Sequence, residues 1–312
     1  MKVDSSKSST TNTQSPSTRP NIVLFALLIW FLFIQRYIIG AYIVNPIIDA
    51  MNARPLHWLA DELINVIVAY FPLLLYLLYL LLSKSKPEPI SAFSIRRLSL
   101  KNVLYITVIT AAFTLTYSWI MLGISFLLGH TPEFVMELSL GQFLIRGAIL
   151  AVVLEEFYFR GLMWNEYRRE RVSFWKTAIA TGLFFGLIHG GFGIVDTTFS
   201  GIFLYAPLIY LTRSIWAPIL HHALVNSMNP IMLNFLSSQE DMEMFFPTFM
   251  IVLTLAVVIL IPIAIISAKK FWTNNRKNVI KKAELPEEGK AFTITYWVLI
   301  ASMTAAIFLF RL

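Results

Sequence analysis

Long apolar segments recur along the whole chain, and this feature limits its fold more than any other. Each segment is close to the ~20 residues that an α-helix needs to cross the ~30 Å hydrocarbon core of a bilayer. With 57% hydrophobic and only 14% charged residues, a soluble domain of 312 residues would leave much apolar surface in water. The sequence therefore predicts an all-α, polytopic transmembrane helical bundle of about eight or nine spans, at 21–44, 62–83, 103–129, 142–163, 175–191, 197–212, 215–236, 246–268 and 291–311.

The ends of this pattern define the expected domain organisation. Residues 1–20 are polar and rich in Ser and Thr, so we expect a disordered tail. The apolar run that follows is too long for a secretory signal and lacks a small-residue cleavage site, so we expect residues 21–312 to form one integral membrane domain. The two shortest spans, 175–191 and 197–212, are also compatible with interfacial or re-entrant segments.

The distribution of Lys and Arg predicts the orientation, because cytoplasmic loops are enriched in these residues. Nine spans and a cytoplasmic N-terminus place all the cationic clusters on one side, in the tail and in the second, fourth and eighth loops. Arg54 is the exception, and Arg213 is the only cation of the sixth loop. Since apolar runs separate the clusters, they predict contact with a lipid bilayer and no nucleic-acid partner. Short loops and the lack of an organelle signal favour a prokaryotic plasma membrane.

Ionisable side chains gather in the middle third of the chain. Such groups cost at least ~2.5 kcal/mol each inside an apolar span, so they indicate a partner, a cavity or a function. Three spans here carry almost all of them, and we expect these spans to enclose a shared polar cavity. The residues concerned are Glu155, Glu156, Arg160, His189, His221, His222 and the neutral Asn226.

Helical spacing separates the roles of the two acids. Glu156 and Arg160 are four residues apart and share a face, so we expect an ion pair. Glu155 lies about 100° around the helix from Glu156 and has no cation on its own helix. A buried carboxylate of this kind is suited to general acid or base chemistry.

The histidines follow the same spacing rule. Phe185 precedes His189 by four residues and places a ring on the same face, and His222 and Asn226 project together from another span. An imidazole and a carboxamide that point to one place can stabilise an oxyanion. His221 lies off that face, so we expect it to have a packing role.

These residues, in this order, resemble the motifs of the CPBP family of intramembrane proteases, also called the CaaX protease and bacteriocin-processing or Abi family, which includes the Rce1-type CaaX endopeptidases. Glu-Glu-x-x-x-Arg stands at 155–160, Phe-x-x-x-His at 185–189 and His-x-x-x-Asn at 222–226. The resemblance covers a core of about 142–230. In the approach to the last motif, Arg213 stands where a glycine is more usual.

The resemblance implies an intramembrane endopeptidase that acts on a membrane-associated peptide or protein. Glu155 would activate water, and His189 would position or deprotonate it. His222 and Asn226 would stabilise the oxyanion, while Glu156 and Arg160 would hold the site and contact the substrate.

The resemblance leaves metal dependence open. Family members are often called metalloproteases, and Glu155, His189 and His222 match a His2Glu zinc set. No HExxH motif is present, and the chain has no Cys to supply a thiolate ligand or nucleophile. The Rce1-type members resemble glutamate-dependent proteases, so we expect no required cofactor, with zinc as the alternative.

Two other functions fit the same residues. A non-catalytic scaffold or bacteriocin self-immunity protein of this fold would keep its function without Glu155. A proton-coupled transporter would also place acids and histidines inside a bundle, but the paired broken helices typical of such carriers are not evident in the sequence.

The predicted spans conflict with the predicted site in one respect. At 1.5 Å per residue, Glu155 and His222 lie about 10–12 Å from the cytoplasmic ends of their spans, but His189 lies about 20 Å from its own. The three meet only if the helix at 175–191 begins outside the membrane, with Trp175 and Lys176 at or beyond the interface, or if these boundaries are wrong.

Overall fold

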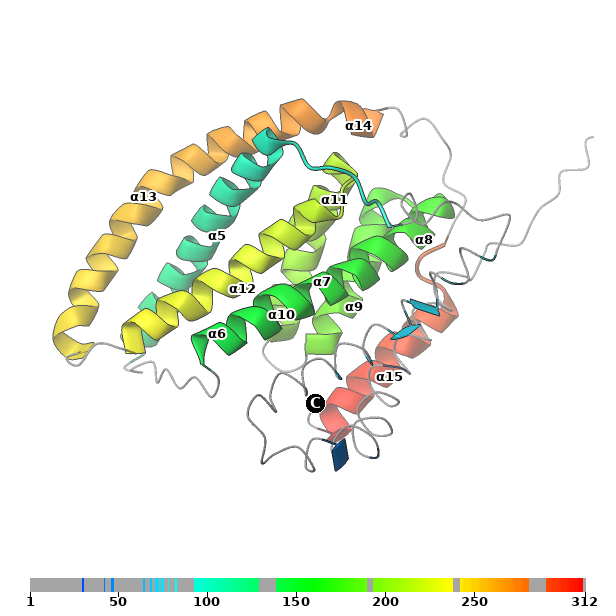
Figure 1. The fold of residues 1–312 in the computed structure, drawn as a ribbon, viewed down its shortest axis with the longest axis horizontal. Helices are drawn as coiled ribbons and strands as arrows, with labels where there is room; N and C mark the ends of the chain where they lie inside the picture. The colour runs from blue at the N-terminus through cyan, green and yellow to red at the C-terminus, as the bar shows by residue number, and fades with distance from the viewer. Residues whose placement is uncertain are drawn as a thin grey trace, which may run out of the picture.

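The computed structural model describes residues 93–128, 139–189, 193–237, 242–280 and 290–310, with isolated positions before residue 93. The predicted tail and most of the first two predicted spans lie outside these residues. The described residues form helices and contain no strand, as the all-α prediction requires. Labels follow Figure 1, in which the chain runs from α5 to α15.

Helices α5, α12 and α13 form one part of the bundle. Helix α5 (Leu100–Leu127) packs against both α13 (Met242–Asn275) and α12 (Trp216–Ser237), and Figure 1 shows the three lying side by side. Ser99 caps α5 by accepting a hydrogen bond from the Asn102 backbone N–H. Along α13, apolar side chains are largely exposed, which is the pattern of a helix that faces lipid.

A second part of the bundle is one unbroken helical run from residue 140 to 169. It consists of α6 (Leu140–Phe143), the π-helical η2 (Leu144–Leu150), α7 (Ala151–Glu156), the π-helical η3 (Phe157–Met163) and α8 (Trp164–Arg169). The two wide π-helical turns flank the short α7, which carries the paired acids. Such turns are frequent at functional sites.

The remaining helices pack around this run. Helix α9 (Phe174–His189) lies against a second continuous run that consists of α10 (Gly193–Ser200), the π-helical η4 (Gly201–Tyr205) and α11 (Ala206–Thr212). Helices α14 (Lys277–Ile280) and α15 (Ile294–Phe310) complete the described chain, and α15 packs on α9.

Glycines allow α9 to approach α10 and η4 closely. A Cβ on Gly186 would lie 2.7 Å from the Ile194 carbonyl oxygen, and one on Gly182 would lie 3.1 Å from the Ile202 backbone nitrogen. The two glycines are four residues apart, which is the small-residue spacing of close helix pairs in membranes. The contact fixes α9, and therefore His189 at its end.

Three described helices are long and apolar enough to cross a membrane: Leu100–Leu127, Ile194–Thr212 and Phe245–Asn275. The second of these extends the short span predicted at 197–212 to a sufficient length. The total of eight or nine spans and the cytoplasmic N-terminus stay predictions. Hydrogen bonds between Ser94 and Asn165, Ser214 and Arg96, and Arg213 and Asn278 do place the second, fourth, sixth and eighth loops at one end of the bundle.

Candidate active site

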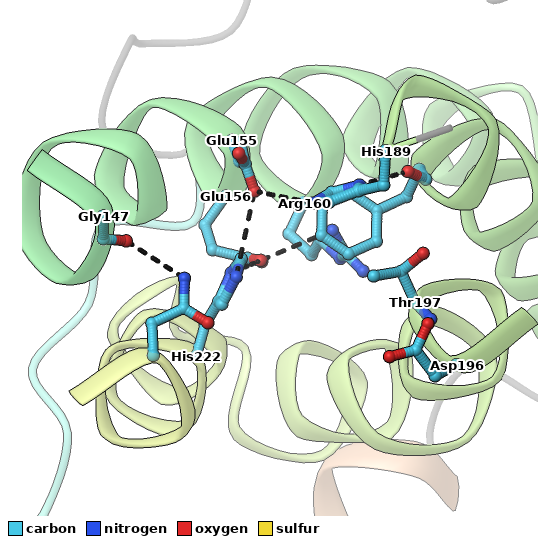
Figure 2. A network of polar contacts seen from close by, with 10 residues as sticks. Gly147, Glu155, Glu156, Arg160, His189, Asp196, Thr197 and His222 are labelled. Carbon is cyan, nitrogen blue, oxygen red and sulfur yellow. Dashed lines mark hydrogen bonds and ion pairs between the residues drawn. The ribbon is translucent and has the colours of Figure 1, made fainter. Parts of the chain in front are cut away.

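Three helices bring the ionisable residues together in the interior of the bundle. Helix α7 ends with Glu155 and Glu156, α9 ends with His189, and α12 carries His222 in its first third. Figure 2 shows the side chains from these separate segments converging. The sequence left open whether the fifth helix begins outside the membrane or has other boundaries than 175–191, and the structure ends this helix two residues earlier, at His189. Helix α9 has only 16 residues and ends beside Glu155, although it begins within one residue of the predicted start.

Glu155 faces both histidines. Its Oε2 atom lies 3.8 Å from Nε2 of His189 and 3.8 Å from Nε2 of His222. These distances exceed a direct hydrogen bond and match a separation bridged by one small donor. The side chains of Glu155 and His189 are 23% and 28% exposed, whereas that of His222 is 5% exposed. A molecule can therefore reach the group from the side of Glu155 and His189.

Glu156 is fully buried, and its carboxylate meets the Nδ1 side of the His222 ring, opposite to the Nε2 side that faces Glu155. Its Oε1 atom accepts hydrogen bonds from Nδ1 of His222 at 2.9 Å and from Nη1 of Arg160 at 3.4 Å. The predicted ion pair with Arg160 is thus present. A buried carboxylate requires such partners because burial without them is very costly.

Arg160 is held mainly by aromatic rings. Its guanidinium carbon lies 4.3 Å from the ring centre of Phe185 and 4.7 Å from that of Tyr205, which are cation–π distances. The sequence analysis missed Tyr205, which also stacks on the imidazole of His222 at 5.1 Å. No spacing pattern relates Tyr205 to the three motifs, so only the packing of η4 reveals it. The glycines of α9 were also missed, although their four-residue spacing was readable.

The hydrogen-bond network assigns the histidine tautomers. Nδ1 of His189 lies 2.8 Å from the Phe185 carbonyl oxygen, which can only accept, so this nitrogen carries a hydrogen. Nδ1 of His222 likewise donates to the ion-paired carboxylate of Glu156. In the neutral form of each ring, Nε2 therefore presents a lone pair to Glu155. Two proton acceptors converge on a third, which is an arrangement suited to binding and deprotonating a small donor.

Asn226 lies on the same helix as His222, one turn further along. Its amide nitrogen donates to the Gly147 carbonyl oxygen of η2 at 3.0 Å, and the dashed line at Gly147 in Figure 2 marks this bond. An amide NH2 has a second hydrogen, so the bond fixes the group while one donor remains. The structure thus ties Asn226 to the helical run that carries Glu155, and does not bond it to the acids or to either histidine.

His221 lies apart from this group. Its Nδ1 atom is 2.6 Å from the hydroxyl oxygen of Thr110 on α5, and the side chain is buried. The ring also lies 5.1 Å from that of Tyr205. These contacts match the packing role that its position on α12 suggested.

The three residues of the predicted His2Glu set face one another. Nε2 of His189 and Nε2 of His222 each lie 3.8 Å from Oε2 of Glu155. Within the described ranges, no group of three or more His, Cys, Asp or Glu side chains meets the geometry of a metal site. The expectation that no cofactor is required, with zinc as the alternative, stays a prediction.

Comparisons with known proteins agree with the motifs. A family model described as type II CAAX prenyl endopeptidase, Rce1-like, matches residues 137–228, a range that overlaps the core predicted at about 142–230. Neither the search of curated proteins nor that of solved structures found a match. The matched range contains all seven fixed residues of the three motifs, from Glu155 to Asn226. The predicted resemblance is confirmed: residues 137–228 are similar to the Rce1-like family.

Proposed function

We propose that this protein is an intramembrane endopeptidase that hydrolyses a peptide bond of a membrane-associated peptide or protein by means of a water molecule activated by Glu155 and His189. The observation that carries the proposal is the convergence of two imidazole Nε2 atoms on one oxygen of Glu155, each at 3.8 Å. The Rce1-like match supports the reaction class.

The tautomers define the first step. Three acceptor atoms that face one another repel unless a proton donor lies between them, and water supplies two hydrogens. Water bound there gives one hydrogen to Glu155 and directs the other to an imidazole. As the oxygen attacks the substrate carbonyl carbon, its proton passes to the Glu155 carboxylate, and a tetrahedral oxyanion forms.

His222 and Asn226 are placed to stabilise that oxyanion. The second amide hydrogen of Asn226 serves as one donor. Nε2 of His222 can donate only while it holds the proton that Glu155 took from water, because its Nδ1 hydrogen is already bonded to Glu156. Hydrogen-bond donors aimed at a developing oxyanion contribute strongly to acyl transfer.

Collapse of the tetrahedral intermediate completes the reaction. The C–N bond breaks, and the proton that Glu155 took from water passes to the departing amine. The products are a carboxylic acid and an amine, so no proton or electron is left unbalanced. Glu156 and Arg160 hold His222 and Phe185 in place and take no part in proton transfer.

The test is a cleavage assay on the purified full-length protein in detergent. The substrate panel contains prenylated CaaX peptides, which the family description suggests, and membrane peptides without a lipid. We compare wild type with Glu155→Gln, and use Glu170→Gln at the end of α8 as the matched control. The proposal is supported if Glu155→Gln lowers the cleavage rate by ~10²–10⁴-fold while Glu170→Gln cleaves as wild type does.

Two results would oppose it. Equal cleavage by wild type and Glu155→Gln would exclude a catalytic role for this acid. If neither protein cleaves any substrate while Glu155→Gln still supports the cellular function, the scaffold or immunity alternative replaces the enzyme. The plasma membrane of a prokaryote is the expected location, and localisation of a tagged protein tests that separately.

A further inference from the structure

A second pocket, lined by arginines, lies at the end of the bundle where the cationic loops meet. It has a volume of about 200 Å³ and is formed by the segment before α5, by α8, and by the junction between α11 and α12, with Asn278 of α14 at its edge. Three guanidinium groups line it, and none of its described lining residues is acidic. The arginines are Arg96, Arg168 and Arg213.

Hydrogen bonds between distant segments build the walls of this pocket. The Ser94 hydroxyl donates to Oδ1 of Asn165 at 3.2 Å, and the Ser214 hydroxyl donates to the Arg96 carbonyl oxygen at 2.6 Å. A guanidinium N–H of Arg213 donates to the Asn278 carbonyl oxygen. These bonds join residues 65 to 118 positions apart in the chain, so the pocket is a formed site and not a gap between mobile loops.

Backbone strain is concentrated at the same place. Three non-glycine residues in the described ranges have a positive φ, and two of them line this pocket: Ser94 at 55° and Arg213 at 53°. The left-handed conformation is unfavourable for these residues and persists where surrounding contacts impose it. At Arg213 it ends α11 and turns the side chain toward Asn278. The strain therefore serves the placement of a charged group.

The lining determines the ligand chemistry. A guanidinium has five N–H donors in a planar fork that suits phosphate. Arg213 uses one donor on the Asn278 carbonyl, and Arg168 uses one on the Val172 carbonyl. Trp164 and Tyr210 supply aromatic walls, with the Arg168 guanidinium 5.5 Å from the Tyr210 ring centre. Tryptophan and tyrosine favour the level of lipid headgroups, and basic pockets between membrane helices suit anionic headgroups.

We propose that this pocket binds a phosphate group through Arg96, Arg168 and Arg213. The group comes from an anionic phospholipid headgroup or from free phosphate. The site is separate from the candidate active site: Trp164 follows Glu155 by nine residues, about 13 Å along the helical run at 1.5 Å per residue. Occupancy would link the segment before α5 to α8 and so brace the helical run that carries both acids.

Thermal unfolding of the full-length protein in detergent tests the proposal, with intrinsic tryptophan fluorescence as the signal. One arm compares phosphatidylglycerol with phosphatidylcholine in the micelles, and the other compares inorganic phosphate with chloride at equal ionic strength. The variant is Arg96→Gln, whose side chain is exposed at the pocket. The matched control is Arg97→Gln, an exposed neighbour outside the lining.

We expect phosphatidylglycerol to raise the unfolding temperature of wild type and Arg97→Gln, and its apparent affinity to fall about tenfold in Arg96→Gln. Stabilisation by inorganic phosphate as well identifies the phosphate group itself as sufficient; stabilisation by the lipid alone identifies the headgroup as the source. Arg168→Gln and Arg213→Lys extend the test to the partly buried arginines.

Three outcomes overturn the proposal. The first is that neither phosphatidylglycerol nor phosphate stabilises the protein beyond its reference. The second is that Arg96→Gln binds as wild type does. The third is that Arg97→Gln loses as much affinity as Arg96→Gln, which would indicate general charge attraction. If Arg168→Gln or Arg213→Lys fails to fold, the exposed Arg96→Gln alone decides.

Discussion

His222 and Glu156 are joined across the bundle: Nδ1 of the imidazole lies 2.9 Å from Oε1 of the carboxylate. The bond links α12 to α7, and the two bonded residues are 66 positions apart in the chain. It also leaves Nε2 of the same ring to face Glu155 at 3.8 Å. The two adjacent acids therefore contact opposite nitrogens of one ring, and they should respond very differently to mutation.

Replacement of either acid by glutamine should separate stability from activity. Glu156→Gln leaves the buried Arg160 without its anion, so we expect a loss of about 3–5 kcal/mol in unfolding free energy together with reduced cleavage. Glu155→Gln should unfold close to wild type, because its side chain is partly exposed and makes no short bond. Denaturation in detergent measures the difference, and similar losses from both variants would contradict it.

Asn226→Ala should lower kcat by about 10²–10³-fold with little change in KM, because an oxyanion donor acts mainly in the transition state. The variant also loses the bond to Gly147, so unfolding must be measured alongside. Asn226→Asp keeps the size but brings a negative charge next to the oxyanion, and we expect it to be at least as inactive. If the activity falls only in proportion to the amount of folded protein lost, Asn226 has a structural role and no role in oxyanion stabilisation.

Gly186→Ala should destabilise the protein by about 1–3 kcal/mol, because the new methyl group meets the Ile194 carbonyl and Thr198. Separation of α9 from α10 would also displace His189. We therefore expect the cleavage rate to fall by more than the loss of folded protein accounts for. Gly123→Ala in α5 is the control, since a Cβ there meets nothing within 4 Å. A tolerated Gly186→Ala would show that the two helices do not need this close contact.

Cleavage should resist a zinc chelator, because the proposed mechanism activates water with Glu155 and the lone pairs of two imidazoles, each 3.8 Å from that carboxylate, and requires no metal. The measurement compares initial rates before and after treatment with 1,10-phenanthroline, with metal content determined by mass spectrometry. Inactivation by the chelator that added zinc reverses would establish the alternative His2Glu site.

Local spacing was sufficient for some parts of the site. The four-residue interval predicts the Glu156–Arg160 pair and the contact between Phe185 and His189, which is edge-to-face, because contacts within one helix depend only on its periodicity. The family resemblance rested on the same intervals and is confirmed over residues 137–228. Sequence alone could therefore nominate Glu155 as the acid without a cation on its own helix.

Contacts between helices were not accessible in this way. The helical rise alone could not say how His189 reaches Glu155, since the position of α9 depends on its packing against α10 and η4. The bond between Asn226 and Gly147 and the stacking of Tyr205 on His222 likewise depend on the separation of packed helices. Periodicity carries no information about such distances, nor does it reveal the wide turns on either side of α7.

Those wide turns determine how the site tolerates changes in chain length. A π-helical turn holds one residue more than an α-helical turn, so deletion of one residue within 144–150 can restore a regular turn and leave Glu155 facing the histidines. Deletion of one residue within 151–154 has no such reserve and rotates the helix by about 100°. Glu156 would then stand where Glu155 stands, and the apolar Phe157 would meet His222. Which of the two glutamates faces the histidines therefore depends on the rotation of the helix, and η2 is a segment in which one residue can be deleted without changing that rotation.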